Sequence, residues 1–266
     1  MNEPYTESEM ERAINFIEER LALQRRCIYL IKNAMYNAAL AILDLAKKFN
    51  IDPKHFKFSL NQSLDKKVDN IISNLIDSIL SDIEDVATFG LSEDNEESRM
   101  MLSWVNISNN GNTIANRIKN YASQFKNEIE VVVAASAFLG KSPKDASNII
   151  KTNLHYPLGS IFVKVAKKEK FSSVQSLEAN LNVGKYTSTF NNIKRASLDT
   201  IARSRQKLFY HREKANGADS WYVKRSSSCP CTTCDMNVGI HKTNEDLPPY
   251  HPNCVCMAIP LNTNKK

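Results

Sequence analysis

The residues best suited to chemistry lie in the last 38 positions, which hold five of the six cysteines. Cys231 and Cys234 form a C-x-x-C pair, and nineteen residues later Cys254 and Cys256 form a C-x-C pair. A C-x-x-C turn places two thiolates where both can reach a tetrahedral zinc ion, and the separation of the pairs lies within the range of zinc sites. The one-residue gap in the second pair is tighter than usual. The spacing predicts a zinc site.

Zinc takes four ligands, and the tail offers more candidates than that. We predict ligation by Cys231, Cys234, Cys254 and Cys256. The nearest alternative is that His251 replaces one of these cysteines, and Cys229 is the outlying candidate.

Two other interpretations of the tail stay open, namely a pair of disulfides and free thiols packed without a metal. The acidic, polar start of the chain lacks the pattern of a signal peptide, which favours a reducing compartment and therefore a metal. A catalytic zinc needs an open coordination position and a nearby general base, and this loop offers only Glu245 and Asp246. We therefore expect no enzymatic activity.

The net charge of +6 conceals a change of sign along the chain. Basic and acidic residues number 11 and 18 in residues 1–98, 11 and 5 in 99–184, and 10 and 3 in 185–225. A basic segment interleaved with aromatic residues can follow a phosphate backbone, whereas the plainer interpretation is a set of solvated helix faces. The candidate nucleic-acid contacts are Lys194, Arg195, Arg203, Arg205, Lys207, Arg212 and Lys214.

Helical periodicity dominates the segments that must position these residues. A capping box at Thr6 and Glu9 opens a helix to about residue 49, and a second box at Ser59 and Gln62 opens another that ends before Gly90. We expect these two helices to form an antiparallel hairpin, with Cys27 in its core. Further helices are predicted over about 113–139, after Ser142, and over about 189–215; 161–165 fits either a strand or a helix, and 221–224 a strand.

The predicted fold is mainly α: a long helical hairpin and further helices, followed by a small zinc-bound, β-containing C-terminal module. Composition and charge divide the chain into 1–98, an acidic helical hairpin; 99–184, a middle helical region; and 185–266, a basic helix with the cysteine-rich module. Only seven residues are glycine and none are clustered, which excludes a phosphate-binding loop. The longest strongly apolar run, 131–139, is too short for a membrane span.

The closing string from Leu247 to Cys256, LPPYHPNCVC, resembles the C-terminal signature of the phage head morphogenesis proteins, the minor head proteins that include the Mu F-like group. The C-x-x-C pair and the helical string IARSR at 201–205 belong to the same resemblance, which covers about residues 186–260. Ser204 stands where threonine is usual in the family, and Val255 where a basic residue is common.

The resemblance implies a low-copy virion protein near the portal vertex that acts in capsid assembly and in DNA packaging or ejection. Its expected partners are the portal or other phage head proteins, through the helical half, and DNA, through the basic segment. No membrane partner is expected. The expected location is the phage head, in multiple copies per virion, and the host cytoplasm during assembly. The rival interpretations are a zinc-dependent nucleic-acid-binding regulator, a metal-dependent hydrolase or transferase, and a helical scaffold protein.

Overall fold

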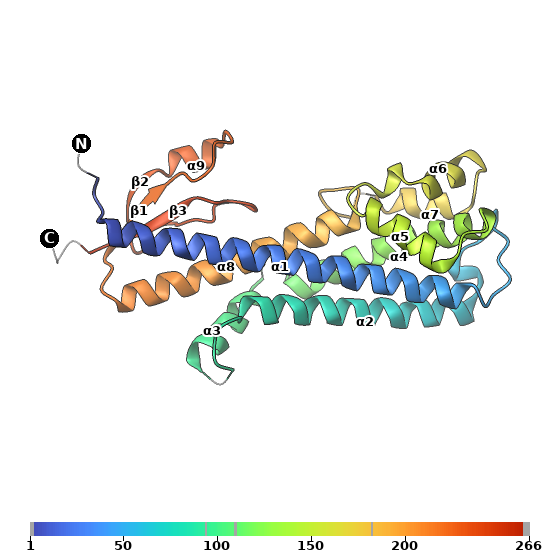
Figure 1. The fold of residues 1–266 in the computed structure, drawn as a ribbon, viewed down its shortest axis with the longest axis horizontal. Helices are drawn as coiled ribbons and strands as arrows, with labels where there is room; N and C mark the ends of the chain where they lie inside the picture. The colour runs from blue at the N-terminus through green and yellow to red at the C-terminus, as the bar shows by residue number, and fades with distance from the viewer. Residues whose placement is uncertain (1–2, 94, 109–110, 182, 263–266) are drawn as a thin grey trace. The chain divides into compact units, whose positions relative to one another are not determined.

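The computed structural model describes residues 3–93, 95–108, 111–181 and 183–262, and in this part the chain is mainly helical with one small antiparallel sheet. The helices are α1 (Glu7–Ala46), α2 (Gln62–Ala87), α3 (Glu96–Val105), α4 (Ile114–Phe138), α5 (Pro143–Asn153), α6 (Ile161–Lys168), α7 (Ser173–Ala179), α8 (Thr189–Ala215) and α9 (Thr232–Met236). The strands are β1 (Ser220–Lys224), β2 (Gly239–Lys242) and β3 (Met257–Leu261) (Figure 1). The predicted fold class, mainly α with a β-containing C-terminal module, is confirmed.

The chain forms two compact units, each assembled from segments far apart in sequence. The first unit comprises Met1–Cys27, Ile83–Ile107 and Ser197–Lys266, and the second comprises Ile28–Asp82 and Ser108–Ala196. Helices α1, α2 and α8 each contribute residues to both units. The three consecutive segments defined by charge are therefore regions of the sequence, and the compact units combine parts of them.

Helix starts follow the capping chemistry of the sequence, with one difference. At α1 the Glu9 amide donates to Thr6 Oγ1 at 3.3 Å and the Thr6 amide donates to Glu9 Oε2 at 2.6 Å, which confirms the first capping box. The second box was wrong, because a 3₁₀ turn occupies Phe58–Leu60 and α2 starts only at Gln62. Asn61 caps α2 instead, accepting from the Leu64 amide at 3.1 Å.

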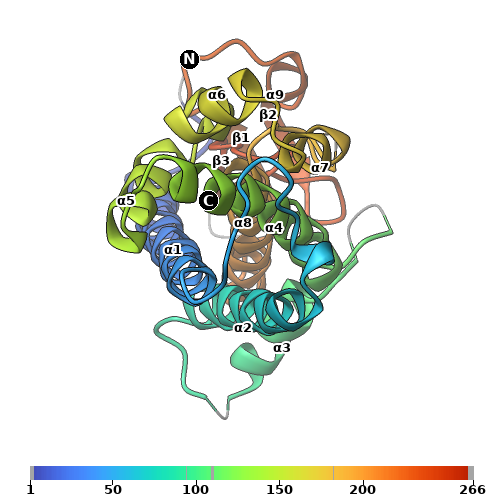
Figure 2. The ribbon, with the colours of Figure 1, turned by 90° about the vertical axis from the view of Figure 1, so that its right-hand side faces the viewer.

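Helix α4 is the core of the second unit, where it packs against α5, α6 and α7. Nine consecutive residues in its second half, 128–136, are buried, so every face of the helix is covered there. Within this unit α2 runs back beside the second half of α1, as the expected hairpin does (Figures 1 and 2). The ambiguous segment at 161–165 is helical, because Ser160 Oγ accepts from the Val163 amide and starts α6.

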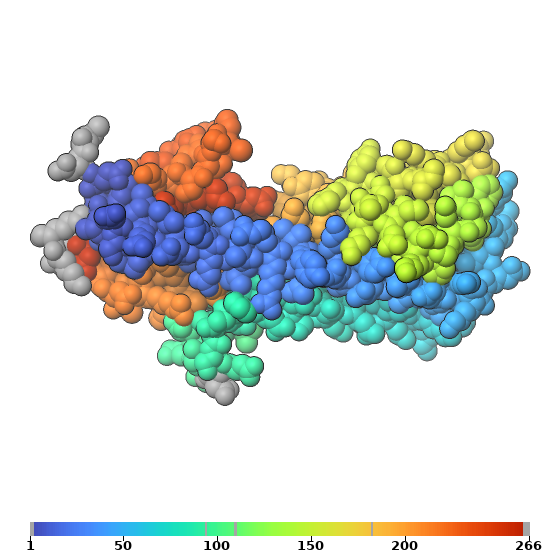
Figure 3. All heavy atoms as spheres, viewed as in Figure 1, coloured from blue at the N-terminus to red at the C-terminus, as the bar shows by residue number. Residues whose placement is uncertain are grey.

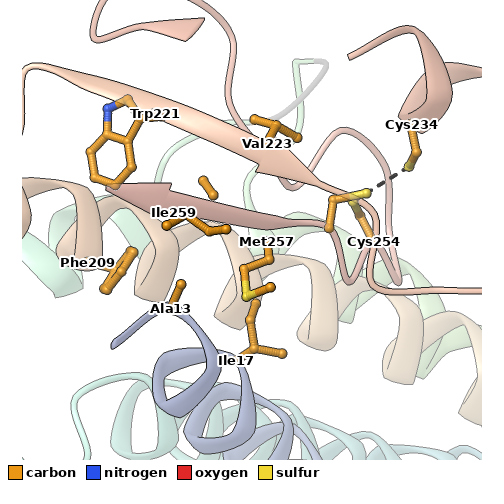
Figure 4. Close-up of a cluster of buried hydrophobic side chains, with 11 residues drawn as sticks. Ala13, Ile17, Phe209, Trp221, Val223, Cys234, Cys254, Met257 and Ile259 are labelled. Atoms are coloured by element: carbon orange, nitrogen blue, oxygen red, sulfur yellow. Dashed lines mark hydrogen bonds between the residues drawn. The ribbon is translucent and has the colours of Figure 1, made fainter. Parts of the chain in front are cut away.

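The first unit contains the sheet, whose strand order is β2-β1-β3 with both pairings antiparallel. In the central strand β1, Trp221 lies opposite His241 of β2 and Pro260 of β3. Trp221 is fully buried in a core cluster that includes Ala13 of α1 and Phe209 of α8 (Figure 4). The sheet is therefore fixed to the first helix of the chain as well as to the helix that precedes it.

No helix among the described residues is long and apolar enough to cross a membrane.

Candidate metal centre

Three short segments of the C-terminal module bring the cysteines together. Cys231 is the N-cap residue of α9 and Cys234 lies within this one-turn helix, so both thiols sit on one turn. His251 lies in the loop after the two prolines at 248 and 249, and Cys254 and Cys256 directly precede β3. We call Cys231, Cys234, His251, Cys254 and Cys256 the Cys/His cluster.

The donor atoms of the Cys/His cluster form two groups that share Cys234. One group is Cys231, Cys234 and His251; the other is Cys234, Cys254 and Cys256; within each, all donor atoms lie within 4.8 Å of one another. Figure 4 shows the Cys234 and Cys254 sulfurs facing each other, 3.9 Å apart. Ligands of a tetrahedral zinc ion with bonds of 2.3 Å have sulfurs about 3.8 Å apart. This cluster can therefore hold a metal ion.

The ring of His251 is oriented as a ligand. Its Nε2 atom lies 3.2 Å from the Cys231 sulfur and 3.1 Å from the Cys234 sulfur. The other ring nitrogen, Nδ1, lies 3.0 Å from the Pro252 carbonyl oxygen. A proton on Nδ1 donated to this carbonyl leaves the Nε2 lone pair directed at the thiols, which is the usual arrangement of a metal-binding histidine.

The surroundings of two of the thiols, those of Cys234 and Cys256, oppose ionisation. Burial raises the pKa of Cys234 and the pKa of Cys256, whereas hydrogen bonding by the Cys234 backbone and thiol lowers the pKa of Cys231. A divalent cation reverses this balance, because a coordinating thiol loses its proton outright. Metal binding would therefore place several negative charges in a largely buried site.

A second layer of polar residues supports the loop that carries His251. Tyr210 of α8 donates its hydroxyl to the Pro248 carbonyl at 2.7 Å. Arg20 of α1 donates from Nη2 to the Cys254 carbonyl at 3.1 Å and from Nη1 to Gln206 Oε1 at 3.1 Å. Burial lowers the pKa of Arg20, and Cys254, Tyr210 and Cys256 oppose this effect when they carry negative charge.

The remaining candidates of the tail lie outside the Cys/His cluster. Cys229 is exposed and belongs to neither group of donors. Glu245 lies 3.2 Å from His241 Nδ1, and His241 is on strand β2 with its Nε2 atom 2.9 Å from the Asn237 carbonyl. Among the described residues, neither donor group contains a carboxylate. Figure 3 shows the outer surface of the C-terminal module, which carries these residues, in orange and red.

Three of the predicted nucleic-acid contacts form ion pairs with acidic residues of the same chain. Arg205 is buried, donates to the Ala87 and Phe89 carbonyl oxygens and pairs with Glu19. Arg203 pairs with Asp199 on the same helix at 3.0 Å. Arg212 donates to both carboxylate oxygens of Glu97, each at 2.7 Å.

The other four predicted contacts form no ion pair among the described residues. Lys207 and Lys214 are exposed, and Lys194 and Arg195 are half-buried. Lys207 and Lys214 are seven positions apart on α8 and so share one helix face. DNA binding by these four residues stays a prediction, and Arg205 cannot contribute to it from its buried position.

Sequence reasoning missed Arg20 and Gln206, which lie 186 positions apart and meet beside Cys254. Arg20 resembles any other basic residue of an amphipathic helix, so no local pattern marks it. Comparison of the chain with protein-family models, with curated proteins and with solved structures gave no match.

Proposed function

We propose that the protein is a non-enzymatic structural component of a phage head, located near the portal vertex, and that a zinc ion clamps its C-terminal module. The observation that carries the zinc clamp is that the donor atoms of four cysteines and one histidine form two groups that share Cys234. The phage assignment rests on the resemblance of residues 247–256 to the closing signature of minor head proteins.

Zinc is the metal that best suits this donor set. Thiolate and imidazole ligands favour zinc over magnesium, calcium or manganese, which prefer oxygen. Bound zinc would supply folding free energy to a module too small to form a large core by itself. Ligands from α9 and from the segment before β3 would connect the two ends of the intervening segment through one metal ion. Such a crosslink would keep the module rigid, as a docking surface requires.

The donor set also favours a structural role over catalysis. A catalytic zinc has three protein ligands and one open position, whereas this cluster offers five donors for four positions. Of the two acidic residues of the loop, Glu245 and Asp246, Glu245 lies beside His241. Both features support a closed site.

Metal analysis of the purified full-length protein tests the zinc clamp. We expect one zinc per chain by native mass spectrometry, and loss of that zinc in Cys234→Ser, which removes the donor that both groups share. Cys229→Ser is the matched control, because Cys229 lies in the same tail but in neither donor group; it should keep the zinc. A wild-type chain that stays metal-free when refolded with zinc and reductant contradicts the proposal.

Incorporation into particles tests the phage role separately. Quantitative mass spectrometry of phage heads assembled with this protein should find it in low copy, together with the portal protein. Cys234→Ser should be missing from the heads and Cys229→Ser should be present. Normal incorporation of a metal-free variant would show that the clamp is not needed for docking, and absence of the wild type from heads would contradict the phage assignment.

A further inference from the structure

Arg20 is a buried cation whose partners are all neutral. Its side chain is 1% exposed, and it donates to an amide oxygen of Gln206 and to the Cys254 carbonyl. The guanidinium also lies over the ring of Phe16, 5.8 Å from the ring centre. Among the described residues no carboxylate forms an ion pair with Arg20, and its Nε atom has no hydrogen-bond partner.

A buried charge without a counter-charge is strongly destabilising, so the position of Arg20 needs an explanation. Cys254, whose thiol can become negative, has its backbone carbonyl in direct contact with Arg20. Any four ligands chosen from four cysteines and one histidine include at least three thiolates. Three thiolates around a divalent ion leave one net negative charge, and four leave two.

We propose that Arg20 is the counter-charge of the metal–thiolate centre, a positioning residue that holds Cys254 through its carbonyl and balances the negative charge of the loaded cluster. This inference rests on the zinc clamp proposed above. It assigns a function to a residue of α1 at the opposite end of the sequence, and it makes the first helix part of the metal site. The charge of Arg20 is then uncompensated without metal and compensated with it.

Arg20→Met tests the proposal, with Arg25→Met as the matched control, an exposed arginine on the same helix. We expect Arg20→Met to weaken zinc affinity by about 10- to 100-fold in competition with a chromophoric chelator, as loss of a residue that supports a metal ligand does. The Tm of the metal-free protein should stay unchanged or rise, because a buried unpaired charge is gone. Arg25→Met should leave the affinity and both Tm values unchanged.

Gln206→Glu provides a second test that keeps the shape of the site. A carboxylate at position 206 would lie within hydrogen-bond distance of Arg20 and compensate its charge in the metal-free state. We expect a higher Tm without zinc and a weaker affinity for zinc, since the new charge opposes that of the thiolates. A merely structural role of Arg20 predicts no loss of zinc affinity in this variant.

The outcomes separate this inference from the zinc clamp. If the wild type binds zinc but Arg20→Met and Gln206→Glu bind it equally well, Arg20 is not the counter-charge and the clamp stands. If Arg20→Met lowers the Tm equally with and without zinc, the residue has only a packing role and the inference is overturned. A wild type that binds no zinc overturns both.

Discussion

Glu128 of α4 is buried in the second unit, where it caps another helix. Its Oε1 atom accepts from the Thr189 amide and from the Thr189 hydroxyl, each at 2.9 Å, at the first residue of α8. The favourable interaction of a carboxylate with a helix N-terminus opposes the penalty of burial. Burial is the larger effect and raises the pKa of Glu128 to about 7.

This raised pKa makes the stability of the protein depend on pH. The protonated form is favoured in the folded state, so the contribution of Glu128 is fully present below about pH 4.5 and is lost as pH rises through about 7. We expect Glu128→Gln to abolish this pH-dependent loss of stability. Relative to wild type, the variant should gain on the order of 3 kcal/mol in free energy of unfolding between pH 4.5 and pH 8.

Urea denaturation of both proteins at several pH values measures this difference. Glu178→Gln is the control, because the side chain of Glu178 is 52% exposed and pairs with Lys167 at the surface; its pH profile should follow that of wild type. Identical pH profiles for Glu128→Gln and wild type would show that Glu128 is not the group responsible.

Single residues were predictable where a local pattern marks them. Cys27 was expected in the core from its place in a helical repeat, and it is completely buried. The metal candidates follow from spacing alone. Arg20 and Glu128 did not stand out, because each acquires its role from a partner more than sixty positions away.

At the scale of elements, β1 is the strand on which the first unit depends. It lies between β2 and β3, and its Trp221 packs against Phe209 and Tyr210 of α8 with ring centres 6.1 and 4.7 Å away. The indole nitrogen of Trp221 has no hydrogen-bond partner among the described residues. Its contribution to stability is therefore one of apolar packing.

Trp221→Ala should consequently lower the free energy of unfolding by about 3 to 5 kcal/mol, the range for deleting a large buried aromatic side chain. Trp221→Phe should lower it by less, because an aromatic ring remains and no hydrogen bond is lost. Trp104→Ala, at a half-buried tryptophan of α3, serves as the comparison and should have a smaller effect than Trp221→Ala. Equal losses in the two alanine variants, measured in urea, would contradict the central role of β1.

Helices were predictable as elements because their signals are local: apolar periodicity and caps. The predicted range of α8, about 189–215, matches its observed bounds. Helix α3 was not predicted, because its capping residue, Asn95, lies in an acidic stretch that is typical of a break between helices. Strands β2 and β3 are short, and their pairing with β1 joins residues far apart in sequence, which no local pattern reveals.

At the scale of the molecule, opposite charges that are far apart in sequence meet within the first unit. Arg212 of α8 pairs with Glu97 of α3 at 2.7 Å, and Glu213 pairs with Arg12 of α1 at 3.1 Å. Buried Arg205 pairs with Glu19. The change of charge sign along the sequence is thus partly compensated inside this unit. Among the described residues, the predicted DNA contacts of α8 that form no ion pair are Lys194, Arg195, Lys207 and Lys214.

The zinc clamp predicts an effect on one unit and not the other. Removal of metal from the full-length protein should raise amide hydrogen exchange in β1, β3 and the part of α1 before residue 28. Exchange in α4 to α7, which belong to the second unit, should stay as it is. The measurement is hydrogen exchange followed by mass spectrometry with and without a chelator. Uniform loss of protection in both units would instead indicate that the two fold as one cooperative unit.

The core of the first unit joins Ala13 and Ile17 to Trp221 and Ile259, residues from opposite ends of the chain. During synthesis on the ribosome, the apolar face of α1 is therefore finished long before the strands that cover it exist. All residues of the second unit have been synthesised once Ala196 has been made. The second unit can therefore fold before the C-terminal residues of the first unit have been synthesised. Because domains generally fold as units during translation, the order of synthesis favours a nascent chain in which the end that carries the Cys/His cluster folds last.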